Sequence, residues 1–199
     1  MSGYEYIIAG LPDLDRDPSK CRIPAFGDVV EEIRSRCPGR DLPTLDFFLK
    51  GLEPDNLDED FYRSAIGSKD RFTREYFRYD LMVRNLKAEY INRSLGRPEG
   101  TDVIVAGEEE PDAEEAAEVD AVLEGKDLLE RERGLDALMW DRSEDLTALD
   151  VLNLDVVLAF ITRLRTVSRW LALDPETGKA FFRRLVDGIR QTYTNKENE

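Results

Sequence analysis

The sequence predicts an all-α protein: a helical bundle with two long amphipathic helices and several short ones. Two observations lead to this prediction. Apolar residues recur every three or four positions through most of the 199 residues, and only the opening run departs from helical spacing. A chain of this length buries roughly 70% of the surface that its unfolded form exposes. We therefore expect a single helical domain over residues 1–199.

The opening run, YEYIIAGLPDL from Tyr4 to Leu14, is too short for its periodicity to separate a buried strand from an extended lead-in. A short extended N-terminal segment is therefore part of the prediction. Asp28 is the expected cap of the first helix after it, and Pro43 lies in the first turn of the second. Helical spacing of apolar residues predicts three short helices here, over residues 28–36, 43–52 and 55–66.

The first long helix is predicted from Asp70 to Leu95, where Gly96 and Pro98 end it. The second is predicted from Thr147 to Leu173. Each has one apolar stripe, which is typical of a helix with one face in a core. The first stripe contains Phe72, Tyr76, Tyr79, Val83, Leu86 and Tyr90, and the second Val157, Phe160, Ile161, Leu164, Val167 and Leu171.

An acidic region separates the two long helices. Residues 99–113 contain glycines, a proline and a run of Glu, which predicts an acidic loop. From Glu108 to Glu132 there are twelve acidic and two basic residues, and the later part, continuing through Lys126 to Trp140, has helical spacing. A last helix is predicted from the cap Asp174 to about Tyr193.

The composition excludes several kinds of chemistry. The chain has no histidine, so it has no Ser-His-Asp triad, no Cys-His pair and no imidazole base. Its two cysteines cannot close a four-thiolate zinc site. Cys21 and Cys37 could pair with each other, but two cysteines do not make a disulfide scaffold, so reduced thiols are the favoured interpretation. A net charge of −15 argues against general nucleic-acid binding. No phosphate-binding loop or calcium loop is present, so no cofactor, metal or small-molecule substrate is expected.

The longest strongly apolar stretch, Val156 to Ile161, is far shorter than the ~20 residues that span a bilayer. We therefore expect a soluble cytoplasmic protein with no direct membrane insertion. Paired carboxylates are abundant, and two are enough for a glycosidase. Because the chain gives no reason to choose any two of them, a carboxylate-based enzyme remains only an alternative.

Charge is unevenly distributed along the chain. Residues 69–97 carry eight basic and four acidic side chains, and residues 163–196 carry eight basic and three acidic ones. The basic helices either pair with the acidic connector or dock an acidic partner, unless they are ordinary solvated faces. The candidate partner-contact residues are Arg78, Arg84, Lys87, Arg163, Arg169 and Arg184.

Three uncharged side chains also stand out. Trp140 and Trp170 are expected to be anchors in a core or a groove. Asn85, inside the first long helix, is expected either to be exposed or to hydrogen-bond to a neighbouring helix end.

Three stretches carry a resemblance to known proteins. The start YEYIIAGLPDL resembles that of a poorly characterised bacterial family encoded with V-type ATPase subunits. FTREYFRYDLMVRNLKAEYINRSLG at 72–96 and the stretch LDVVLAFITRLRTVSRWLALDPETGKAFFRRLVDGI are similar to its long helix and its closing helix pair. The first of these is also weakly similar to the C subunit of V-type ATPases, called the d subunit in eukaryotic enzymes, with Asp80, Asn85 and Lys87 as the nearest equivalents.

The resemblance implies a non-catalytic role. The C subunit of V-type ATPases is a helical connector that receives the central shaft on the membrane rotor ring, and the expected partners are therefore the other V-type ATPase subunits. This chain is shorter than that connector, so it either replaces it or acts as an accessory factor, peripheral to the membrane through a membrane-protein partner. The alternative is a helical adaptor or regulatory protein unrelated to ion transport.

Overall fold

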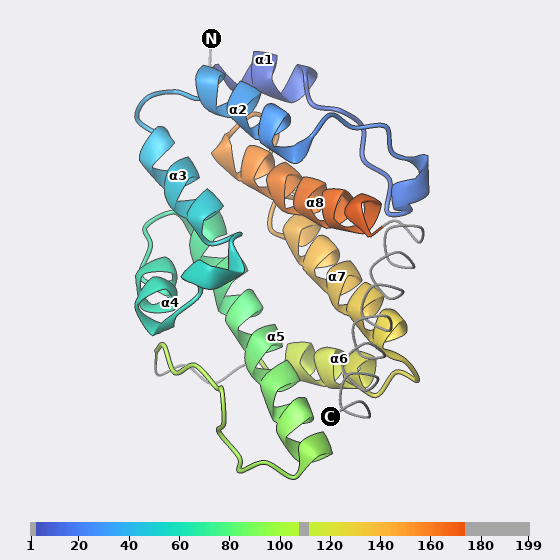
Figure 1. Cartoon of the computed structure of the whole chain (residues 1–199). Helices are drawn as coiled ribbons and strands as arrows, with labels where there is room; N and C mark the ends of the chain where they lie inside the picture. Colours follow the sequence, from blue (N-terminus) through green and yellow to red (C-terminus); the bar gives the residue numbers. More distant parts are fainter. Residues whose placement is uncertain (1–2, 108–111, 174–199) are drawn as a thin grey trace, which may run out of the picture.

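The computed structural model describes residues 3–107 and 112–173, and all regular elements in these ranges are helical (Figure 1). The prediction of an all-α bundle is confirmed. The elements are α1 (Tyr4–Ala9), η1 (Pro18–Lys20), α2 (Phe26–Arg36), α3 (Leu42–Lys50), η2 (Pro54–Asn56), α4 (Glu59–Ile66), α5 (Arg71–Leu95), α6 (Ala113–Leu123), α7 (Leu128–Asp145) and α8 (Leu154–Ala172).

Helix α8 lies at the centre of the bundle. Val157, Leu158, Ala159 and Ile161 are all inaccessible to solvent, so this part of the helix is buried on every side. A helix that is apolar all round needs neighbours all round. Helices α1, α2, α3, α5 and α7 provide them, and α1 and α2 lie next to α8 at the top of Figure 1.

Helix α5 confirms the prediction of a long helix from Asp70 to Leu95. The carboxylate of Asp70 caps it by accepting the backbone N–H of Thr73 at 2.8 Å. At the other end Gly96 adopts a left-handed conformation with φ of 65°, which a glycine adopts without steric strain. The predicted stripe faces inward, and the rings of Phe72, Tyr76 and Phe77 pack around Phe48 of α3.

The prediction of an extended N-terminal segment is wrong. Residues 4–9 form α1, with Tyr4 and Ile7, one helical turn apart, both buried. The hydroxyl of Tyr4 donates to a carboxylate oxygen of Asp41 at 2.6 Å. Tertiary packing against α8 therefore decides a conformation that the local sequence leaves open.

The second long helix begins seven residues later than predicted, at Leu154 instead of Thr147. Asn153 caps it, because its side-chain oxygen accepts the backbone N–H of Val156 at 3.2 Å. Residues 146–153 form a loop between α7 and α8, which we call the α7–α8 loop. Its exposed apolar residues extend the apparent helical pattern beyond the true start of the helix.

The short helices have ends that differ from the predicted ones. The cap of α2 is Ala25, and Asp28 instead lies in the first turn, where a carboxylate favours the helix dipole. The predicted helix over 55–66 is divided into η2 and α4, because Asp58 caps α4 through the backbone N–H of Phe61 at 2.7 Å.

The acidic region contains two helices of its own. Residues 97–107 are irregular, as predicted for the acidic loop, and α6 begins at Ala113. With 18 residues, α7 is nearly as long as α8, so the described part has three long helices. A second hydrophobic cluster joins this region to α5. It contains Tyr79, Met82, Val83, Val119, Leu123 and Leu135.

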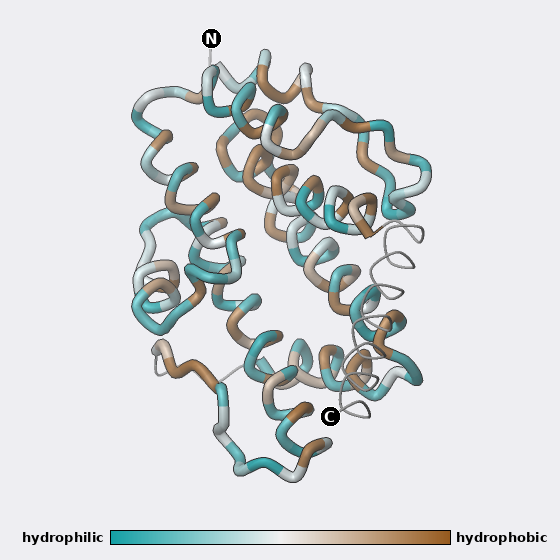
Figure 2. Tube along the Cα trace, viewed as in Figure 1, coloured by the Kyte–Doolittle hydropathy of each residue, from teal (hydrophilic) through white to brown (hydrophobic). Residues whose placement is uncertain are grey.

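The apolar residues are concentrated on the inward faces of the helices (Figure 2). Within residues 3–107 and 112–173, no helix combines the length and the hydropathy that crossing a membrane requires. The predicted helix from Asp174 to Tyr193 and the candidate Arg184 lie outside the described residues.

Candidate functional site

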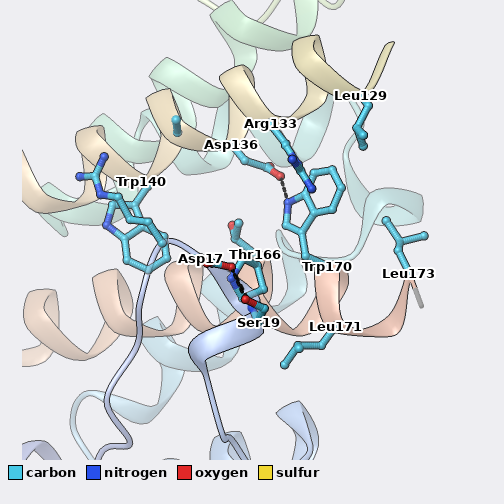
Figure 3. A pocket seen from close by; sticks show the side chains of 13 residues that line it. Asp17, Ser19, Leu129, Arg133, Asp136, Trp140, Thr166, Trp170, Leu171 and Leu173 are labelled. Carbon is cyan, nitrogen blue, oxygen red and sulfur yellow. Dashed lines mark hydrogen bonds between the residues drawn. The ribbon is translucent and has the colours of Figure 1, made fainter. Parts of the chain in front are cut away.

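An open groove with a volume of about 1080 Å³ lies between η1, α7 and α8 (Figure 3). Its lining is mostly apolar, and we call it the aromatic groove because both tryptophans of the chain contribute to it. This agrees with the expectation that they anchor a core or a groove. The apolar side chains that line it are Pro18, Leu129, Ala137, Trp140, Trp170, Leu171 and Leu173.

Trp170 of α8 is held against α7 by a polar pair. Its indole N–H donates to a carboxylate oxygen of Asp136 at 2.6 Å (Figure 3). Asp136 also pairs with Arg169. The guanidinium groups of Arg133 and Arg169 lie 5.3 and 5.7 Å from the indole ring, within cation–π range. Burial raises the pKa of Asp136, against the opposing effects of Arg169 and Trp170.

Trp140 of α7 has the same kind of surroundings. Its indole N–H donates to Glu144 at 2.8 Å, and the guanidinium groups of Arg16 and Arg163 each lie 5.7 Å from the ring. Arg16 also donates to Glu144 at 2.6 Å. Burial disfavours the charged carboxylate, but the hydrogen bonds from Trp140 and Arg16 outweigh it, so the pKa of Glu144 is lowered.

The two tryptophans of the groove therefore have equivalent surroundings. Each indole ring has a carboxylate that accepts its N–H and two arginines near the ring. Both indole N–H groups already have partners, so neither is offered to a ligand. What the groove offers is the partly exposed ring of Trp170 and the exposed side chains of Leu129, Leu171 and Leu173, because Trp140 is only 6% exposed. Tryptophan and arginine are also the residue types that dominate the energetics of protein interfaces. This arrangement suits a peptide segment or helix better than a small polar substrate.

A second feature is the α7–α8 loop, which exposes three large apolar side chains. The exposed fraction is 97% for Leu149, 73% for Val151 and 42% for Leu152. Single exposed apolar residues are normal on a protein surface, but a contiguous group marks an interaction site. The sequence pattern hides this group, because it predicts a helix over residues 147–153. The sequence signal that could have placed the true start of the helix is Asn153 followed by Asp155, a pattern that is typical of a helix N-terminus.

Polar contacts of Asp150 hold the α7–α8 loop in place. Asp150 accepts from Arg71 at 2.6 Å and from the side-chain amide of Asn153 at 2.8 Å. The backbone N–H of Asp150 also donates to the carbonyl of Thr147 at 2.9 Å. These contacts hold the loop against α5, while Leu149, Val151 and Leu152 face solvent.

The cations predicted to contact partners mostly have partners inside the chain. Lys87 on α5 pairs with Glu132 on α7, Arg163 pairs with Glu144, and Arg169 pairs with Asp136. Lys87 thus pairs with the acidic stretch 108–132, which is one of the uses considered for the uneven charge, while the partners of Arg163 and Arg169 follow that stretch on α7. Burial lowers the pKa of Arg163 despite the nearby Glu144.

Arg78 and Arg84 lie near the middle of α5. Arg78 donates to Glu75 at 3.0 Å within the same helix. Arg84 is exposed and lies close enough to Asp80 to favour its charged form. The candidates within the described residues do not form one site, and their contact with a partner stays a prediction.

Asn85 clamps the irregular segment that follows α5. Its side-chain amide donates to the carbonyl of Ile104 at 2.8 Å and accepts the backbone N–H of Ile104 at 3.0 Å. Two turns on, Asn92 donates to the carbonyl of Thr101 at 2.8 Å. Asn85 therefore hydrogen-bonds to a loop and not to the helix end that we considered.

Carboxylates do not converge on a metal site in the described residues. No group of three or more Cys, Asp or Glu side chains is placed to hold an ion in residues 3–107 and 112–173. The partly buried Asp80 instead accepts the hydroxyl of Tyr62 at 2.6 Å, and desolvation raises its pKa. Cys21 and Cys37 are both buried free thiols, as expected.

Comparison with known proteins gives one match. Residues 107–193 match a protein family described as "Protein of unknown function (DUF2764)". The match includes α6, α7 and α8, which carry most of the aromatic groove and the whole α7–α8 loop. No curated protein matches the chain. No solved structure matches it either. The C-terminal half is therefore similar to a family whose function has no assignment.

Proposed function

We propose that this chain is a non-catalytic subunit or accessory factor of a V-type ATPase or ATP synthase. In this role it connects the central shaft to the membrane rotor from the cytoplasmic side. Its partners are other ATPase subunits, and the resemblance of its opening motif and its long helices to the ATPase-linked family supports that partner class.

The α7–α8 loop is the observation that carries this proposal. Leu149, Val151 and Leu152 are apolar, adjacent and exposed, while Asp150 and Asn153 hold the loop in place. A fixed apolar surface loses little conformational entropy when a partner covers it, and it gains the hydrophobic free energy of burial. A connector needs such a surface.

Charge supports an apolar docking surface over a basic one. Lys87, Arg163 and Arg169 are paired with carboxylates of α7, so a partner would have to displace those contacts to use them. Exposed ion pairs contribute only about 0–1 kcal/mol each, which makes them weak anchors for a stable complex.

The test is affinity capture from cells that naturally produce the chain. Tagged full-length protein is compared with Leu149→Asp/Val151→Asp and with a matched control, Val105→Asp. Val105 is 71% exposed but lies on the loop after α5. We expect the unaltered protein and the control to capture ATPase subunits, and the double variant to lose them.

Two results would contradict the proposal. If no form captures an ATPase subunit, the ATPase role is rejected, and reproducible capture of another partner through the same loop would favour a helical adaptor. If the double variant captures ATPase subunits as well as the control does, the loop is not the docking surface.

A further inference from the structure

The described chain ends at the edge of the aromatic groove. Leu171 and Leu173 line the groove, and they are 41% and 62% exposed although they are large apolar side chains. Leu129, at the opposite edge on α7, is 52% exposed. Residues 3–107 and 112–173 leave these apolar side chains uncovered, and an exposed apolar groove of this size marks a binding site.

The sequence that follows has the properties such an occupant needs. Its pattern predicts a helix from Asp174 to about Tyr193, about 30 Å long at 1.5 Å per residue. This is close to the length of α7, whose 18 residues span about 27 Å. At 100° per residue, six apolar side chains share one face of that helix. They are Phe181, Phe182, Leu185, Val186, Ile189 and Tyr193.

The charge of the opposite face also fits. Residues 174–193 carry four basic and three acidic residues, a net charge of +1. The net charge of the whole chain is −15, so the rest of the molecule does not repel the segment. With its apolar face in the groove, the cations would lie at the rim or in solvent. The basic residues are Lys179, Arg183, Arg184 and Arg190.

The family match is a second observation that links the groove to the segment after α8. It begins at residue 107 and ends at residue 193, so it joins α6, α7 and α8 to the segment that follows α8. Its end coincides with Tyr193, the last of the six apolar positions. The sequence unit therefore contains both most of the groove and its candidate occupant.

We propose that residues 174–193 dock as an amphipathic helix in the aromatic groove of the same chain, with their apolar face against Trp170 and the leucines at the edges of the groove. The segment covers the partly exposed ring of Trp170 and the exposed side chains of Leu129, Leu171 and Leu173, and it joins α7 and α8 as a third helix. This docking does not involve the α7–α8 loop, so its test is independent of the test of the proposed ATPase role.

Limited digestion of the full-length protein with trypsin tests the docking, because Arg183, Arg184 and Arg190 are cleavage sites within the segment. Leu129→Asp places a charge in the groove but leaves α7 intact, because a carboxylate in the first turn favours a helix. The matched control is Leu149→Asp on the α7–α8 loop, which lies outside the groove lining. We expect cleavage at these arginines to be at least about tenfold faster in Leu129→Asp and unchanged in the control.

Tryptophan fluorescence gives the reciprocal test, because the chain has only two tryptophans and both line the groove. Leu185→Asp/Ile189→Asp alters the apolar face of the segment. Gln191→Asp/Thr194→Asp adds the same charge to the opposite face. We expect the first pair to shift the emission to longer wavelength and to increase quenching by acrylamide about twofold. The second pair is expected to leave both unchanged.

The proposal is overturned if Leu129→Asp is cleaved at the unaltered rate, or if both double variants give the same fluorescence. Protection that is lost on dilution would also overturn it, because the segment would then occupy the groove of a second copy. If Leu185→Asp/Ile189→Asp loses helical signal beyond the segment itself, the digestion of Leu129→Asp decides the question.

Discussion

The indole N–H of Trp170 donates to a carboxylate oxygen of Asp136 at 2.6 Å, and this bond joins α8 to α7 at the aromatic groove. Asp136 is largely buried, and it also pairs with Arg169. Removal of the carboxylate leaves a partly buried donor and a guanidinium without their acceptor. A double-mutant cycle on Asp136 and Trp170 measures the coupling free energy of this bond.

We expect Asp136→Ala to lower the free energy of unfolding by about 1–3 kcal/mol, measured by urea denaturation. Trp170→Phe removes the donor as well as part of the ring. In the double variant the two effects should not add, with a coupling free energy of about 1 kcal/mol or more. Additive effects would mean that the bond contributes nothing to stability.

Gly51, at the end of α3, is a position that only glycine fits. A Cβ atom there would lie 2.3 Å from the ring carbons of both Phe61 and Phe77. Because these rings are packed in the main core, Gly51→Ala is expected to destabilise the protein by about 1–3 kcal/mol. Gly27→Ala in α2 is the control, since nothing lies within 4 Å of its added Cβ atom. It should be neutral or stabilising by up to about 1 kcal/mol, and equal loss of stability in both variants would refute the packing argument.

The clamp by Asn85 predicts a local effect. Asn85→Ala removes two hydrogen bonds to the backbone of Ile104, with an expected loss of about 1–3 kcal/mol. Amide hydrogen exchange at Ile104 and its neighbours should accelerate, while exchange in α8 changes only as far as global stability does. Ser94→Ala, whose hydroxyl bonds to Tyr90 within the same helix, is the comparison. If the loop exchanges at the same rate in both variants, the clamp does not hold it.

Asp80 makes stability depend on pH. Burial raises its pKa, opposed by the hydrogen bond from Tyr62 and by the charge of Arg84. A folded-state pKa above the unfolded value, near ~3.9, means that folding favours the protonated acid. Its stabilising contribution is fully present below the unfolded pKa, and it is lost as the pH rises through the folded one.

We therefore expect Asp80→Asn to gain less stability than the unaltered protein when the pH falls from about 7 to about 4. Other carboxylates titrate in the same range, so the test compares slopes. Asp13→Asn, at an exposed position, removes the same charge and should keep the slope of the unaltered protein. Urea denaturation across this pH range gives the slope of the free energy of unfolding against pH. Identical slopes in the two variants would mean that Asp80 does not contribute to the pH dependence.

The long helices show how far sequence patterns reach. The start of α5 is predicted to within one residue, because Asp70, a continuous apolar stripe and Gly96 are all local signals. The start of α8 differs from its prediction by seven residues, because Leu149, Val151 and Leu152 continue an apolar pattern that only burial distinguishes from a helix face. A stripe predicts which residues avoid water only where a neighbouring element covers them.

The candidate surfaces depend even more on tertiary structure. Arg163 and Arg169 are candidates because the long helices are basic, but their carboxylate partners come from α7. Trp140 and Trp170 are recognisable as anchors, yet nothing local indicates that they line the same groove.

The sequence by itself determined the all-α class, the long helix α5 and the missing imidazole chemistry, because these follow from periodicity, caps and composition. Only the tertiary structure decided that residues 4–9 are helical, that Lys87, Arg163 and Arg169 pair with carboxylates of α7 and that Leu149 faces solvent. The physical reason is the same in each case. Helical spacing fixes which side chains share a face, but the packing of distant segments decides whether that face meets a core, a charge or water.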